Sequence, residues 1–107
     1  METYDHYING VWETPASGTY FETENPYTGE VWAKIARGNA KDADRAVRAA
    51  KAAFEGPWGD LTPTARGKLL VRLAELIERD CERLGVLEVR DNGKLIAEMG
   101  GQTKYLA

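Results

Sequence analysis

One long amphipathic stretch, residues 62–84, constrains the fold of this chain more than any other feature. Thr62 is a favourable N-cap, and Pro63 suits the first helical position because the N–H that proline lacks would have no helical partner there. Charged residues fill one face, and the opposite face carries apolar residues at helical spacing, namely Leu69, Leu70, Leu73, Leu76, Ile77 and Leu84. The pattern predicts a helix with one side packed against a core and the other facing water.

Length and charge exclude several classes of protein. At 107 residues the chain is at most one small domain, and its net charge of −3 comes from interleaved acidic and basic residues without a basic stripe for nucleic acid. No apolar run approaches the roughly 20 residues that span a bilayer, and the start METYDHYING is polar and acidic, unlike a signal or transit peptide. The single cysteine fits a reducing compartment. We therefore expect a cytoplasmic protein.

The first third of the chain indicates β-structure. Residues 7–12 (YINGVW) form a short β-prone run, and Asn9-Gly10 in its middle suggests a tight turn or bulge. Residues 20–37 then read as two extended runs around NPYTG, in which Pro26 presets one turn dihedral and Gly29 tolerates a positive φ. These residues predict a β-hairpin over 20–37.

A second helix is predicted over residues 39–55. Asn39 is a favoured N-cap, and Asp42 can complete the reciprocal capping box. Val47 and Phe54 lie on one face with several alanines, which allow another element to approach closely. Gly56-Pro57 ends the helix.

The signals weaken after residue 84. Gly85 interrupts the apolar pattern, so a separate helical segment is predicted over 85–92, with Gly93 as its left-handed C-cap. Ile96 and Met99 then begin a further helical period over 95–107. The chain ends at Ala107 inside that period, which is typical of a piece of a longer chain. A frayed natural terminus is the alternative.

Cys81 is the one candidate nucleophile, and its neighbours disfavour that role. It lies on the long helix beside Asp80 and Glu82, and nearby carboxylates disfavour the thiolate that reactivity requires. The only histidine, His6, lies in an N-terminal approach that we expect to be unstructured, without metal-ligand spacing to Cys81. We interpret Cys81 as a structural or surface cysteine and His6 as solvated.

The carboxylates of the long helix resemble an acid–base cluster, but basic residues are interleaved with them. A solvated, ion-paired helix face has the same pattern, and it is the simpler interpretation. The acidic residues are Glu75, Glu78 and Glu82, and the basic ones are Arg72, Arg79 and Arg83.

The order of the motifs resembles the N-terminal stretch of the NAD(P)-dependent aldehyde dehydrogenase superfamily. YINGVW, ENPYTGEV, NAKDADRAVRAAKAAF, TARGKLLVRLAELIERD and DNGK follow one another in family order, from about Tyr7 to Ala107. Each motif alone is weak, and the five in register are specific. The residues that carry the match include Asn25, Pro26, Gly29, Arg66, Asn92, Gly93 and Lys94.

The resemblance implies oxidation of an aldehyde to a carboxylic acid with NAD(P). The implied fold is α/β, and this chain would supply an N-terminal β-hairpin and three to four helices of the coenzyme-binding domain. The family's nucleophilic cysteine, general-base glutamate, oxyanion asparagine and coenzyme-binding residues all lie downstream of the matched region. No catalytic or cofactor-binding residue is therefore predicted in this chain, and its implied partner is the remainder of the enzyme, which is usually a homo-oligomer.

The resemblance also implies a structural monovalent cation. Some members hold one with backbone oxygens near the hairpin and the aspartate of DNGK, positions that correspond here to Thr23, Glu24 and Asp91. The site would need a further, downstream residue that this chain lacks.

A second interpretation is a small stand-alone module that binds a partner or dimerises through its helices. The two interpretations differ in how the apolar helix faces are covered. A segment of an enzyme leaves the faces around Leu69–Leu73–Ile77, Val47–Phe54 and Ile96–Met99 only partly buried, whereas an independent module closes on itself or on a second copy.

Overall fold

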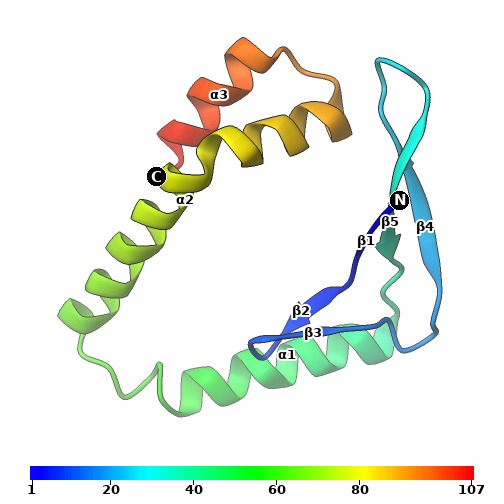
Figure 1. Ribbon diagram of the computed structural model, residues 1–107. Coiled ribbons are helices and arrows are strands. Elements are labelled where there is room, and N and C mark those ends of the chain that lie inside the picture. Colours follow the sequence, from blue (N-terminus) through cyan, green and yellow to red (C-terminus); the bar gives the residue numbers. More distant parts are fainter. The chain divides into compact units, whose positions relative to one another are not determined.

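The computed structural model describes all 107 residues, which form five strands followed by three helices (Figure 1). The chain divides into two compact units. The first consists of Met1–Thr23 and Val31–Leu61, and the second of Glu24–Glu30 and Thr62–Ala107. No helix is both long and apolar enough to span a membrane.

The Asn9-Gly10 turn joins strands β2 (His6–Ile8) and β3 (Val11–Glu13) in an antiparallel hairpin. Asn9 has a φ of 52° and Gly10 a φ of 81°, which are the two positive values that a type I′ turn requires. Tyr7 pairs with Trp12 across the strands, and their ring centroids are 5.0 Å apart. The predicted tight turn is thus confirmed. The prediction that His6 lies in an unstructured approach is wrong, because His6 begins β2.

The predicted hairpin over 20–37 is also present. Strands β4 (Tyr20–Glu24) and β5 (Val31–Ala36) are hydrogen-bonded neighbours. In the turn between them, the Asn25 N–H donates to the Glu30 carbonyl and the Gly29 N–H to the Asn25 carbonyl, and Gly29 has a φ of 69°. Strand β1 (Glu2–Tyr4), which was not predicted, pairs in parallel with β5 and completes the sheet order β1-β5-β4.

Helix α1 (Ala40–Glu55) begins and ends where its capping residues predict. The Asn39 side chain accepts hydrogen bonds from the N–H groups of Lys41 and Asp42, while Asp42 accepts one from the Asn39 N–H. At the other end Gly56 is the C-cap, and its N–H donates to the Ala53 carbonyl. The capping box thus satisfies donors that the helix itself leaves unpaired.

Helix α2 (Pro63–Asn92) is one continuous helix of 30 residues, which corrects the predicted division between 62–84 and 85–92. Thr62 caps it through a hydrogen bond from the Ala65 N–H, and Gly93 ends it with a φ of 74°. Gly85 does not break the helix, because helix α3 packs on it: a β-carbon added at Gly85 would lie 3.7 Å from the backbone of Met99 and Gly100. Tertiary packing here overrides the low helix propensity of glycine.

Helix α3 (Ile96–Tyr105) folds back along the C-terminal part of α2, as Figure 1 shows for these two neighbouring helices. Met99 and Thr103 are its buried residues, and the Thr103 hydroxyl donates to the Met99 carbonyl at 2.8 Å. Lys104 lies 4.0 Å from Glu78 of α2. The predicted helix over 95–107 is thereby confirmed, although it ends at Tyr105.

Very little apolar surface is buried. The buried hydrophobic residues are Ala33, Ala36 and Met99, all of modest size or flexible. Met99 is only 4% exposed, so the prediction that its helix face would be left open is wrong at this residue, whereas Ile96 is 55% exposed. The other two predicted faces are open, since the exposed fractions are 51% for Leu69, 52% for Leu73, 67% for Val47 and 72% for Phe54.

Candidate functional site

The most highly connected polar group of the first unit is the carboxylate of Asp42, at the N-terminus of α1. It is 4% exposed and accepts three hydrogen bonds at its two oxygens. The Asn39 N–H donates at 2.9 Å, the Ala16 N–H at 2.9 Å and Arg45 Nη2 at 2.6 Å. These donors, the Asn39 N–H first, lower the pKa of Asp42 from 3.8 to about 2.

Arg45 extends this cluster to the β2–β3 hairpin. Its guanidinium pairs with Glu13, the last residue of β3, and reaches the Thr14 carbonyl at 3.5 Å. The neighbouring carboxylates, Asp42 first, raise the pKa of Arg45. On β2, opposite Glu13, the Nε2 atom of His6 lies 3.9 Å from Asp42 Oδ2 and forms no hydrogen bond.

This cluster holds the fold together rather than performing chemistry. Both oxygens of Asp42 are occupied by donors, and a carboxylate whose pKa is about 2 is a poor base at neutral pH. Asp42 was predicted only as a capping residue, because the hydrogen bond from Ala16 comes from 26 residues away and leaves no local pattern in the sequence. His6 is accordingly a half-buried neighbour of this cluster and not a solvated terminal residue.

Within the second unit, the turn of the β4–β5 hairpin contacts the end of α2. A β-carbon built on Gly93 would lie 3.2 Å from Pro26 Cβ and 3.3 Å from its Cγ. The Asn25 side chain accepts from the Tyr27 N–H at 2.9 Å, and the Asn92 side chain accepts from the Lys94 N–H at 2.9 Å, so both loops carry their own internal hydrogen bonds. The NPYTG and DNGK segments are therefore direct neighbours.

The three residues of the predicted cation site lie on different elements. Thr23 and Glu24 are the last two residues of β4, and Asp91 is the penultimate residue of α2. Thr23 belongs to the first unit, and Glu24 and Asp91 to the second. No cluster of three or more His, Cys, Asp or Glu side chains that could hold a metal occurs in the chain. The predicted site depends on backbone oxygens, so it stays a prediction.

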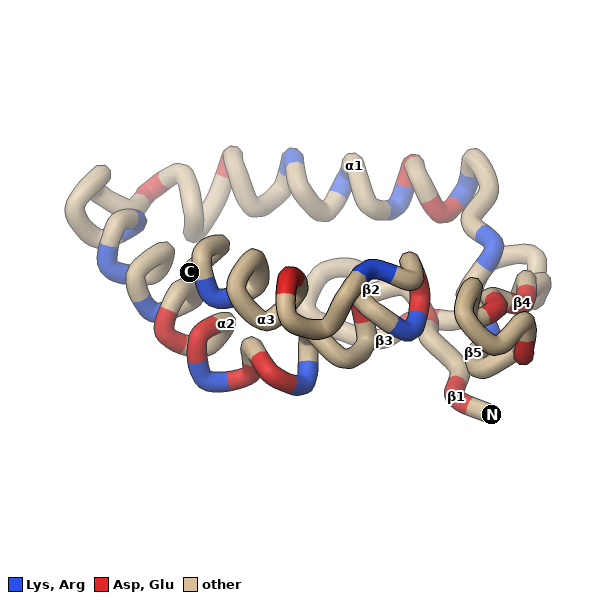
Figure 2. The backbone as a smooth tube through the Cα atoms, turned by 90° about the horizontal axis from the view of Figure 1, so that it is seen from above, with Lys and Arg blue, Asp and Glu red and all other residues tan.

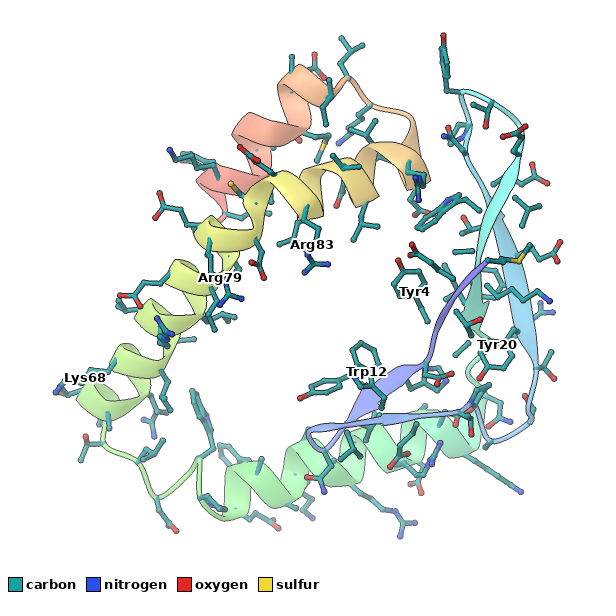
Figure 3. The ribbon with its side chains drawn as sticks, in the orientation of Figure 1. Tyr4, Trp12, Tyr20, Lys68, Arg79 and Arg83 are labelled. Carbon is teal, nitrogen blue, oxygen red and sulfur yellow. The ribbon has the colours of Figure 1, made fainter.

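Two acidic residues of α2, Glu75 and Asp80, are paired with arginines, as predicted for a solvated face. Arg72 contacts Glu75 at 2.8 Å, and Arg79 contacts Asp80 at 2.9 Å. Arg79 and Arg83 project from the same side of α2 and flank Asp80, whose pKa is lowered chiefly by Arg79 (Figure 3). Figure 2 shows basic and acidic residues interspersed along α1 and α2.

Cys81 lies on α2 next to this ion-paired segment. It is half-buried and free of any disulfide. The only histidine, His6, belongs to the first unit and lies beside Asp42. The interpretation of Cys81 as a structural or surface cysteine stays a prediction.

Comparison with known proteins shows the family. The Aldehyde dehydrogenase family matches residues 12–107. Over 108 aligned residues the chain is 44% identical to (Z)-2-((N-methylformamido)methylene)-5-hydroxybutyrolactone dehydrogenase of Acinetobacter baylyi, covering 100% of this chain and 22% of that protein. It is 50% identical over 90 residues to the mitochondrial aldehyde dehydrogenase of Rattus norvegicus, covering 82% of this chain and 17% of that protein.

Solved structures give the same result. The NAD-dependent aldehyde dehydrogenase of Sinorhizobium meliloti matches with a TM-score of 0.92 and 31% identity, over 97% of this chain and 21% of that one. A betaine aldehyde dehydrogenase variant of Staphylococcus aureus in complex with NAD+ matches with a TM-score of 0.87 and 36% identity, over 92% of this chain and 20% of that one.

The chain therefore belongs to the aldehyde dehydrogenase family, and its strands and helices are part of that α/β fold. It spans about a fifth of the length of the relatives that it matches, and it corresponds to their N-terminal part. This short coverage favours a segment of an enzyme over an independent interaction module.

Proposed function

We propose that this chain is the N-terminal part of an NAD(P)-dependent enzyme that oxidises an aldehyde to a carboxylic acid. The observation that carries the proposal is the family match over residues 12–107. The chain spans only about a fifth of the length of its relatives, which supports a part of the enzyme. NAD+ is the coenzyme named for the Staphylococcus aureus and Sinorhizobium meliloti relatives, which supports the same coenzyme class here.

The chain's own share in that function is structural. The Asn39–Asp42 capping box and the Arg72–Glu75 ion pair stabilise helices, and the open apolar faces of α1 and α2 are surfaces for burial rather than for chemistry. Nucleophile, general base and coenzyme site would come from the remainder of the polypeptide. We accordingly expect no dehydrogenase activity from residues 1–107 alone.

A monovalent cation held by Thr23, Glu24 and Asp91 is a second part of the proposal. Carbonyl and carboxylate oxygens are the donors that such hard cations prefer. The contact between Pro26 and Gly93 supports it, because these residues lie close in sequence to Glu24 and Asp91 respectively. Because the site also needs a residue downstream of this chain, its test uses a hybrid in which the aligned part of this chain replaces the matching 90 residues of the rat mitochondrial enzyme. Na+ or K+ should raise the unfolding temperature of that hybrid more than tetramethylammonium does, and Asp91→Asn should abolish the difference. Equal unfolding temperatures with all three cations would contradict the site.

The oligomeric state is proposed from the family, and the location in the cell is predicted from the sequence. Family members are usually homo-oligomers, and oligomerisation through the full-length protein is proposed on that ground alone. A cytoplasmic location likewise stays a prediction.

A segment exchange tests the proposed function. The matching 90 residues of the rat mitochondrial enzyme are replaced by the part of this chain that aligns with them, and NADH formation from an aldehyde substrate of that enzyme is measured. The matched control carries the corresponding segment of the Equus caballus enzyme, which also aligns with this chain over 90 residues.

We expect the hybrid to remain soluble and to oxidise the aldehyde with NAD+, and the isolated chain to have no activity. A hybrid that folds but has lost activity, while the control keeps it, would contradict the proposal. So would aldehyde oxidation by the isolated chain.

A further inference from the structure

We draw no further inference here: the strongest candidate, the apolar groove of the first unit between the β2–β3 turn and the alanine-rich face of α1, lined by Tyr7, Ile8, Ala46 and Ala50 among others, carries nothing because nothing in the structure shows what covers it.

Discussion

Pro26 and Gly93 are in direct contact within the second unit, although a strand and two helices separate them in the chain. A β-carbon at Gly93 would lie 3.2 Å from Pro26 Cβ, closer than most real β-carbon contacts. The contact joins the turn after β4 to the left-handed C-cap of α2. Pro26 belongs to the NPYTG motif and Gly93 to the DNGK motif, both of which carry the resemblance to aldehyde dehydrogenases. Their contact explains structurally why the two motifs occur together.

Gly93→Ala should loosen the end of α2. Its φ of 74° costs a residue with a side chain roughly 1 kcal/mol or more, and the added methyl group also presses on Pro26. We expect amide hydrogen exchange in the last turn of α2 to accelerate about fivefold or more, since 1.4 kcal/mol corresponds to about a tenfold change.

Gly67→Ala is the matched control for this substitution. Gly67 lies in the same helix, has nothing within 4 Å of an added β-carbon and has no positive φ. Alanine should stabilise the helix there by about 1 kcal/mol. Equal effects of both substitutions would contradict the role of the left-handed cap.

Gly85→Leu should detach α3 from α2. A β-carbon fits at 3.7 Å from the backbone of Met99 and Gly100, but the branched atoms beyond it would overlap α3. Exposing Met99 costs about 1.5–3 kcal/mol, so amide protection over residues 96–105 should fall by at least tenfold. Gly85→Ala is the control and should keep α3 in place. Unchanged protection of α3 in the leucine variant would refute this packing.

Asn39→Ala should weaken the first turn of α1. The side chain accepts from the N–H groups of Lys41 and Asp42, and loss of such a cap costs about 1 kcal/mol. We expect faster amide exchange at these two residues and lower helical circular dichroism. Lys41→Ala leaves the cap intact and should change neither. If the two variants behave alike, the cap contributes nothing.

Acid should disrupt the Asp42 cluster at an unusually low pH. The pKa of Asp42 is depressed in the folded chain from 3.8 to about 2, so its stabilisation is fully present above pH 4 and is lost as the pH falls toward 2. The amide signal of Ala16, which donates to this carboxylate, should titrate with a midpoint near 2.

Asp42→Asn should remove that titration and release the Ala16 amide, because a neutral side chain keeps only one acceptor oxygen. Asp44→Asn, at an exposed position of the same helix, should leave the Ala16 signal as in the wild type. A midpoint near 4 for Ala16 in the wild-type chain would show that Asp42 is not held as described.

Helix caps and tight turns could be predicted from the sequence, whereas contacts between residues far apart in the chain could not. Caps and turns depend on residues only a few positions apart, so the residue types predict them correctly. This holds for the capping box at Asn39, the C-cap at Gly93 and the Asn9-Gly10 turn. Strand β1 was missed because Glu2–Tyr4 gains its structure from pairing with distant β5. The break predicted at Gly85 is absent, because helix propensity takes no account of α3, which packs on this residue.

The same distinction applies to the site. The ion-paired face of α2 was predicted from charges a few residues apart, and it is present. The Asp42 cluster was not predicted, because Glu13 at the end of β3 and Ala16 just after it are far from α1 in the sequence. His6 was interpreted as solvated for the same reason, since its position in the sequence gives no hint of Asp42.

Thermal unfolding of the isolated chain, followed by circular dichroism together with the binding of a dye to exposed apolar surface, tests the central claim most directly. Residues such as Leu69, Val47 and Phe54 are more than half exposed, so we predict a broad transition without cooperativity and strong dye binding. A sharp cooperative transition with little dye binding would contradict the account, since it would mean that these 107 residues bury their apolar faces without the rest of an enzyme.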